Sequence, residues 1–372
     1  KAERGVRLAR GVEAAPVKSV ALALDDGMNV EDGFAAIVQG CLAQFQANLP
    51  GVLYPLPNPL PHAGEGANVM PTPPLPNPPP QAGEGANARP KPIDDIEYVH
   101  QARVALRRLR AALRLFRGKC VLPDELMGGL RTLASTLGPA RDWDVLCTET
   151  LPEIAAHYAD AAAWQRGADA LEVHRAEVRA AMRSALAQAQ PGAWLLAMQR
   201  WLLQHGWRRS ALGNVAPEAQ RLVQLSPLDK WARRALKKGH RRIARGARKF
   251  AQLQPPERHA LRIAIKRQRY TAEFFQTLFG GKRQARYLAV LRDAQDSLGR
   301  ANDAHIAQGL LAAVHTTPHV LQNVVDRSPL GQAETGPMRD FALGWLAAKE
   351  AGAGNGESAG HLNAFLALKP YW

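Results

Sequence analysis

The sequence of 372 residues is poor in cysteine, and its three cysteines, Cys41, Cys120 and Cys147, are odd in number and widely spaced. No Cys-x-x-Cys pair occurs, so the sequence indicates neither a zinc site nor a disulfide framework, and we expect no metal and no cofactor. No run of about 18 apolar residues marks a membrane-spanning helix, and no basic head with an apolar core marks a secretion signal. These absences favour a protein of the reducing cytoplasm.

Acidic residues are also scarce relative to basic ones. The chain has 33 Asp and Glu against 48 Lys and Arg, and its net charge is +15. A surplus of this size predicts a polyanionic partner, with nucleic acid, an acidic membrane surface and a polyphosphate as candidates. The hydrophobic share of 46% excludes a wholly disordered chain. At about 100–200 residues per domain, the length allows two or three domains.

Helical periodicity dominates the chain from residue 94 onward, where Leu, Ala, Arg and Gln are frequent and β-branched runs are few. A further helix is expected from Asn29 to about residue 49, and the alternation before residue 24 is typical of a short strand. The pattern predicts an all-α fold of bundled helices. The later helices are expected at residues 95–117, 123–137, 141–159, 162–189, 193–205, 228–250, 257–279, 283–298, 303–314 and 338–350.

Residues 50–92 interrupt this pattern with 14 of the 27 prolines. Within them the unit Pro55–Asn68 returns as Pro74–Asn87 with two differences. Proline and glycine at this density leave no apolar face to bury, so we expect an extended surface insert between two helices. A ligand for a proline-binding domain is the functional alternative.

One predicted helix carries five basic side chains on one face. Their spacings from the first member are 3, 7, 10 and 14 residues, which places them within an arc of about 80°. No acidic residue occurs between Tyr98 and Pro123 to neutralise them within their own helix. Such cations repel one another and need solvent or an anion in front of them. The row consists of His100, Arg103, Arg107, Arg110 and Arg114.

A second helix repeats the first about one domain length later. Downstream of each helix lies a related motif, Leu137–Asp142 and Leu298–Asp303. The helices are offset by 159 residues and the motifs by 161, which predicts an internal duplication. In the helices, the residues His259, Arg262, Lys266, Arg267 and Arg269 match His100, Arg103, Arg107, Arg108 and Arg110 position by position.

A third basic helix is expected at residues 229–250, which hold ten Lys and Arg and one acidic residue. The matching segment of the first unit, residues 31–49, has no Lys or Arg. The binding surface should therefore carry more positive charge on the second unit than on the first. The basic side of the helix is expected to carry Arg233, Arg234, Lys237, Arg241, Arg245 and Arg248.

These motifs together resemble the CHAD family, the conserved-histidine α-helical domain. The resemblance rests on His-x2-Arg-Val-x2-Arg-Arg-Leu-Arg from His100, its echo ending in Arg-Tyr-x2-Glu from His259, and the Leu-Gly-x-Ala-Arg-Asp segment at Leu137. It covers roughly residues 30–372, with the proline-rich insert as a departure. The resemblance implies two pseudo-symmetric four-helix bundles around a basic cavity, which binds inorganic polyphosphate and has no assigned chemistry. The bundles would span residues 29–215 and 216–372.

The first 28 residues resemble the end of a CYTH domain, through the run Lys-Ala-Glu-Arg-Gly-x-Arg-Leu that starts at Lys1. That domain is a β-tunnel triphosphatase with a Glu-x-Glu-x-Lys strand. No such strand occurs in this sequence, so we expect a remnant of the domain without its catalytic activity.

Arginine-rich helices suit a polyphosphate, because guanidinium groups give forked hydrogen bonds to phosphate and stay charged in crowded basic surroundings. A lysine there would partly deprotonate, and the two motif histidines should stay neutral until an anion arrives, with proton uptake near pH 7. We expect the two helices that carry the motif histidines and the 229–250 helix to bind the polyphosphate chain between them. The predicted site comprises His100, Arg103, Arg107, Arg108, Arg110, Arg114, Arg141, Arg233, Arg234, Lys237, Arg241, Arg245, His259, Arg262, Lys266, Arg267, Arg269 and Tyr270.

Three other interpretations remain open at this level. The basic faces can be merely solvated, although two such faces need not share one His and Arg register. A nucleic-acid-binding protein would use the same helices, but the sequence has no helix-turn-helix, RNA-recognition or zinc signature. A triphosphatase would release phosphate from tripolyphosphate. We expect Glu273 to orient Lys266 or Arg269 rather than to act as a base, and Tyr270 either to contact phosphate or to pack between helices.

Overall fold

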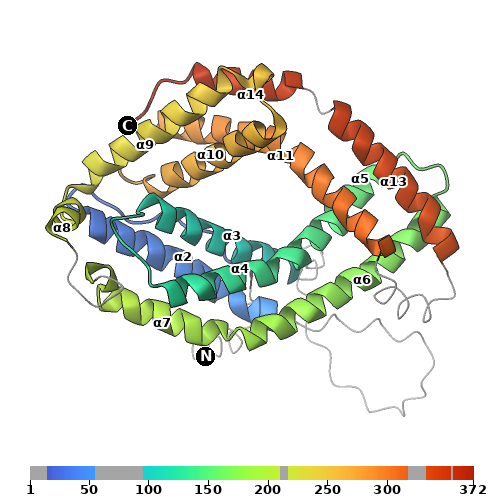
Figure 1. The fold of residues 1–372 in the computed structure, drawn as a ribbon, viewed down its shortest axis with the longest axis horizontal. Coiled ribbons are helices and arrows are strands. Elements are labelled where there is room, and N and C mark those ends of the chain that lie inside the picture. Colours follow the sequence, from blue (N-terminus) through green and yellow to red (C-terminus); the bar gives the residue numbers. More distant parts are fainter. Residues whose placement is uncertain (1–14, 55–94, 210–216, 317–331, 353–354) are drawn as a thin grey trace, which may run out of the picture.

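The computed structural model describes residues 15–54, 95–209, 217–316, 332–352 and 355–372 (Figure 1). All regular elements within these ranges are helices, which confirms the all-α prediction. The strand expected before residue 24 is wrong for the described part, because residues 15–25 are irregular. Their backbone bonds to side chains instead of to a second strand: Asn48 Nδ2 donates to the Val17 carbonyl over 2.8 Å, and Thr277 Oγ1 donates to the Leu22 carbonyl over 2.9 Å.

The first half of the chain begins with a capped helix. The Asn29 side chain accepts from the Asp32 amide, and the Asp32 carboxylate accepts from the Asn29 amide, which satisfies two amides of the first turn. The helix continues to Leu53 through Pro50, so the first residues of the predicted insert at 50–92 are helical. The rest of the insert, from residue 55, lies outside the described residues, as do residues 1–14 of the CYTH-like segment. The elements are α2 (Val30–Leu53), α3 (Asp95–Leu115), α4 (Asp124–Val145), the π-helix η1 (Leu146–Thr150), α5 (Leu151–Ala155), α6 (Ala161–Gln188), α7 (Pro191–Leu203) and the 3-10 helix η2 (Gly206–Arg208).

The second half begins with a short α8. Its basic helix and the second motif helix are α9 and α10, and α11 runs without a break through Gly299, where the sequence predicted two helices. The elements are α8 (Glu218–Gln224), α9 (Leu228–Ala247), the 3-10 helix η3 (Phe250–Gln252), α10 (Pro255–Phe274), α11 (Lys282–Thr316), α13 (Gln332–Gly352) and α14 (Asn355–Leu366).

The same correction applies to α4, which runs through Gly138 and Pro139 although these residues predicted a break. Proline inside a helix removes one backbone donor and crowds the carbonyl four residues earlier. The contacts of α4 with α3, α6 and α7 offset this cost. The glycine has a packing reason, since a Cβ at Gly138 would lie 3.1 Å from Nη1 of Arg103 on α3. The small residue therefore lets α4 approach the basic row of α3.

Neighbouring helices follow one order in both halves. In the first half α2 packs on α3 and α3 on α4, and in the second half α9 packs on α10 and α10 on α11. The two halves meet where α3 contacts α10, in the middle of Figure 1, while α6 and α7 run along one edge and α9 and α14 along the opposite edge. The basic helices α3 and α10 are thereby brought together.

Two hydrophobic clusters hold the helices together, and both draw on residues before and after position 215. The larger includes Phe34 of α2, Leu109 of α3 and Ile265 of α10. The smaller joins Trp143 of α4 to Met338 of α13, among others. The predicted units therefore share their cores across the boundary at residue 215. No helix in the described part of the chain is long and apolar enough to cross a bilayer.

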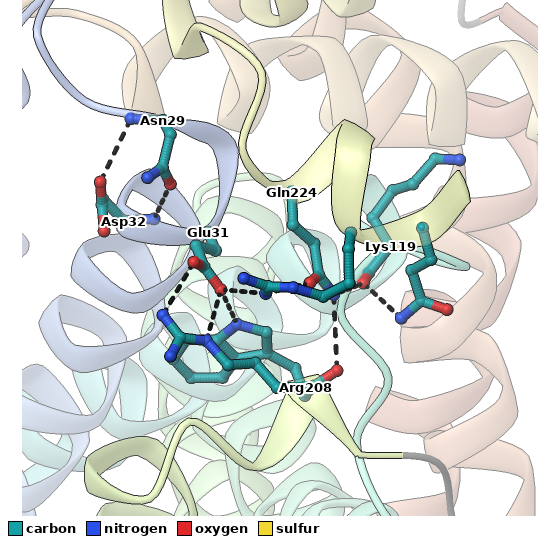
Figure 2. A network of polar contacts seen from close by, with 9 residues as sticks. Asn29, Glu31, Asp32, Lys119, Arg208 and Gln224 are labelled. Carbon is teal, nitrogen blue, oxygen red and sulfur yellow. Dashed lines mark hydrogen bonds and ion pairs between the residues drawn. The ribbon is translucent and has the colours of Figure 1, made fainter. Parts of the chain in front are cut away.

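A buried carboxylate ties the segment between the halves to the start of α2 (Figure 2). Glu31, whose side chain is 3% exposed, accepts hydrogen bonds from Trp207 Nε1 at 2.9 Å, Arg208 Nε at 3.0 Å and Arg221 Nη1 at 2.9 Å. Burial raises the pKa of Glu31, but the bonds from Arg208, Trp207 and Arg221 outweigh it and lower the pKa to about 2. The carboxylate therefore stays ionised and anchors the linking segment to α2.

Candidate functional site

The basic row of α3 follows the helical geometry expected from its spacing. On the opposite face of α3, Leu106 and Leu109 are each 1% exposed and form part of the core. In the row itself, His100, Arg103 and Arg107 are half-buried, and Arg110 and Arg114 are exposed. The row thus runs from the interior at its N-terminal end to solvent at its C-terminal end.

Each half of the chain places one arginine of the motif helix beside one aspartate of the downstream motif. Arg103 Nη2 lies 3.6 Å from Asp142 Oδ1, which belongs to α4. Arg262 Nη2 lies 3.9 Å from Asp303 Oδ1, which belongs to α11. The two motifs that repeat in the sequence thus form equivalent arginine–aspartate pairs in the structure.

The charge of Arg107 acts on the arginine of each pair. Burial lowers the pKa of Arg103, and the charge of Arg107 lowers it further, against the opposing effect of Asp142. Burial also lowers the pKa of Arg262, where Asp303 opposes the shift and Arg107 adds to it. The Nε atom of Arg107 is buried and has no hydrogen-bond partner. One guanidinium of α3 is therefore close enough to affect both halves.

Lys266 of α10 occupies the position that matches Arg107. Burial lowers its pKa to about 8, with further lowering from Arg107, Arg262 and Arg269, while Asp303 opposes the shift. This direction agrees with the expectation that a lysine among arginines partly loses its proton. We call the residues that converge here the central basic site. It consists of His100, Arg103, Arg107, Arg141, Arg262, Lys266 and Arg269, with Asp142 and Asp303 at its edge.

The two motif histidines have different surroundings. His100 is half-buried, and its pKa is lowered by burial and by the charges of Arg141 and Arg107, which agrees with a neutral imidazole. Arg141 is held by Glu149, whose Oε1 accepts from its Nη2 at 2.8 Å. His259, by contrast, is exposed at the start of α10. The two histidines match in the sequence, but one is half-buried and the other is exposed.

Arg108 and Tyr270 lie in the packed contact between α3 and α10 and not in the basic row. Arg108 is 6% exposed, and its Nη1 donates to Glu273 Oε2 over 2.6 Å. Tyr270 is 3% exposed, and its hydroxyl is buried without a partner. Residue 108 follows Arg107 by one helical step of about 100°, which turns it from the row toward α10. Arg108 was predicted to contact phosphate, and Tyr270 either to contact phosphate or to pack between helices. The structure places both in a helix contact.

Arg269 is oriented by two neighbours. Its Nη1 donates to Glu273 Oε1 over 2.7 Å, and its Nε donates to Gln295 Oε1 over 3.0 Å. The first contact agrees with the expectation that Glu273 orients a basic residue. Gln295 of α11 was not predicted, because a glutamine in a long helix carries no motif signal.

A second basic cluster lies where α10 packs on α3 and on α9. The pKa of Arg267 on α10 is lowered by burial, then by the charges of Arg114 on α3 and Arg242 on α9. Arg242 was not among the predicted site residues, although it belongs to the basic helix that the sequence indicated. We call Arg114, Arg242 and Arg267 the second basic cluster.

The predicted residues of the third basic helix lie on its exposed face. Arg233 contacts Asp229 at 3.8 Å, and its guanidinium carbon lies 4.6 Å from the centre of the Phe279 ring. The other basic residues make no ion pair with any residue in the described ranges. The structure does not bring these residues into the central basic site. The exposed residues are Arg233, Arg234, Lys237, Lys238, Arg241, Arg242, Arg245 and Arg248.

Comparisons with known proteins agree on the fold. A family model described as CHAD domain matches residues 86–312, which includes both motif helices. The chain is similar to the crystal structure of the CHAD domain from the plant Ricinus communis, with 26% sequence identity, a TM-score of 0.68, and 96% of this chain and 99% of that chain covered. It is also similar in fold to PptA from Streptomyces chartreusis, with 15% identity, a TM-score of 0.51, and coverage of 91% and 98%. No curated protein matches the chain.

Proposed function

Because this chain belongs to the CHAD domain family, we propose that its central basic site binds inorganic polyphosphate, the role attributed to that family. Association with polyphosphate granules would follow from this binding. The proposal assigns no chemistry to the site, so purified protein should release no phosphate from tripolyphosphate with or without a divalent metal.

The observation that carries the proposal is that the charge of Arg107 acts on the arginine of both arginine–aspartate pairs. Six cationic groups and a histidine converge there, with two aspartates at the edge. Repulsion and burial both oppose this arrangement in the empty protein, as the lowered pKa of Lys266 indicates. A polyanion would relieve the repulsion and gain charge-assisted hydrogen bonds from several guanidinium groups at once.

Polyphosphate fits this site better than nucleic acid does. A polyphosphate presents only phosphate oxygens, and the residues of the central basic site offer guanidinium, ammonium and imidazole groups. Single-stranded nucleic acids usually bind where aromatic side chains form stacking surfaces beside the basic groups. The nearest aromatic side chain of α10, Tyr270, is buried under Arg269, whose guanidinium carbon lies 4.8 Å from the ring centre.

Titration with long-chain polyphosphate tests the proposal, with duplex DNA as competitor. The test variant is Arg107→Glu/Lys266→Glu, which reverses two charges in the central basic site. The control, Arg131→Glu/Arg286→Glu, reverses two exposed charges elsewhere on α4 and α11. We expect tight, salt-sensitive binding by the wild type and the control, at least a tenfold loss in the test variant, and little displacement by DNA. Equal losses in both variants, or equal affinity for DNA, would instead indicate a general basic surface.

A further inference from the structure

The exposed face of α9 carries a second row of cations. Its members are spaced 4, 7 and 11 residues from the first, so they lie within an arc of about 60°. The opposite side of α9 carries Leu236 and Ile243, which are each 0% exposed. We call this set the α9 row, and it consists of Arg234, Lys238, Arg241 and Arg245, all exposed.

The α9 row is uncompensated. No acidic residue occurs between Asp229 and Glu257, and the four members make no ion pair with any residue that the structure describes. Like charges one helical turn apart destabilise a helix by about 0.2–0.5 kcal/mol per pair. The equivalent helix of the first half, α2, has no Lys or Arg at all. The equivalent place in the first half thus holds a helix without these cations, so helix packing alone does not explain the charge of α9.

The second basic cluster connects the α9 row to the central basic site. Arg242 lies on the flank of the row, about 80° from Arg234 around the helix. Its charge and that of Arg114 both act on Arg267 of α10, the residue after Lys266. Cations thus continue from Arg107 along α3 to Arg114, past Arg267, and on to α9, and α10 packs on both α3 and α9.

We propose that the α9 row is a second binding track for the same polyanion, which engages only polyphosphate chains long enough to extend beyond the central basic site. This inference rests on the proposed function and adds chain-length selectivity to it. Polyphosphate has identical charged units along its length, so a chain held at the central site presents further phosphates to any cations that continue the path. The four exposed side chains then add affinity in proportion to the phosphates that reach them.

A ladder of polyphosphate chain lengths tests the inference. The variant Arg234→Gln/Lys238→Gln/Arg245→Gln removes three charges of the α9 row. The control Arg131→Gln/Lys282→Gln/Arg286→Gln removes three exposed charges from α4 and α11. Glutamine has nearly the helix propensity of Lys and Arg, so both proteins should fold, which circular dichroism checks.

For wild type and control we expect affinity to rise with chain length and then level off. In the α9 variant it should level off at a shorter length, with short-chain affinity unchanged. For long chains the variant should lose at least tenfold, and its slope of log affinity against log salt should fall by about 2. An equal loss for short and long chains, or no difference from the control, overturns the inference.

Three other results have separate meanings. If the α9 variant keeps its affinity for long polyphosphate but loses binding to duplex DNA, the α9 row is a nucleic-acid surface and the inference is wrong. If wild-type protein binds no polyphosphate of any length, the proposed function itself fails. If polyphosphate binding depends on Arg107 and Lys266 but not on the α9 row, the proposed function stands without the inference.

Discussion

Arg108 of α3 and Glu273 of α10, 165 residues apart in the chain, form an ion pair of 2.6 Å across the contact between the two halves. The Arg108 side chain is 7% exposed, and its guanidinium carbon lies 5.1 Å from the centre of the Phe274 ring. The pair joins the basic helices at the place where their charges would otherwise drive them apart. Its carboxylate also holds Arg269, so one acidic group both joins the halves and orients a residue of the central basic site.

Replacing Glu273 with alanine should destabilise the protein strongly. The change leaves Arg108 buried without a counter-charge, which typically costs about 3–5 kcal/mol. Chemical denaturation of the wild type and Glu273→Ala measures the difference. The double variant Arg108→Met/Glu273→Leu is the control, because replacing both partners of a buried pair with apolar residues costs far less. If the two variants are equally unstable, the ion pair itself is not the cause.

The pH dependence of stability should carry the signature of Glu31. Its folded pKa of about 2 lies below the ordinary value of 4.5, so its contribution is fully present above pH 4.5. That contribution is lost as the pH falls through the range from 4.5 to about 2. Urea unfolding measured at several pH values in this range should show a steeper loss for wild type than for Glu31→Gln. Parallel curves for the two proteins would contradict the assignment.

Polyphosphate binding should be coupled to protonation of Lys266. The pKa of Lys266 in the protein without ligand is about 8. A bound anion favours the charged ammonium, so binding should take up protons above about pH 8. Affinity should fall as the pH rises through this value. Calorimetry at pH 8.5 in buffers of different ionisation enthalpy measures the uptake, and Lys266→Arg should reduce it. Identical heats in all buffers would contradict the coupling.

The proton uptake expected near pH 7 from histidine is tested in the same way with His100→Gln.

The lowered pKa of Lys266 should also affect the stability of the protein without polyphosphate. Because the folded pKa of Lys266 lies below its ordinary value of 10.5, charging this lysine opposes folding. The penalty is fully present below about pH 8 and is relieved as the pH rises from 8 toward 10.5. The melting temperature of Lys266→Met should therefore be higher than that of the wild type at pH 7. The difference between the two melting temperatures should shrink toward pH 10. A constant difference would indicate a packing effect.

Asp142 and Asp303 should compete with bound phosphate for the paired arginines. Each ion pair, at 3.6 Å and 3.9 Å, is worth about 0.2–1 kcal/mol. Removing both carboxylates with Asp142→Asn/Asp303→Asn should raise polyphosphate affinity roughly two- to thirtyfold. It should also lower the melting temperature of the empty protein, because the cations lose their nearest counter-charges. Fluorescence-based titration and thermal melting check the two effects, and a loss of affinity would show that the aspartates position the arginines instead.

Much of the site follows from spacing along the chain. Positions His100 to Arg114 lie on one helical face because the rotation per residue is a local property of the backbone, and Leu106 and Leu109 are buried for the same reason. The repeat offset of about 160 residues likewise indicated that Arg103 and Arg262 would have equivalent surroundings, and both lie beside an aspartate. The helix breaks expected at Gly138 and Gly299 were wrong, because contacts with other helices support turns that local propensity disfavours.

What spacing along the chain could not supply is the packing of one half against the other. Arg108 and Arg267 occupy matching positions in the repeat, yet one is buried against Glu273 and the other lies near Arg114 and Arg242. Matching residues of α3 and α10 have identical surroundings only if the two halves are related by exact symmetry. The symmetry is not exact, so the matching residues differ in burial. The local pattern therefore determined which residues are helical and basic, whereas the contact between α3 and α10 determined which of those charges are buried, which converge and which remain in solvent.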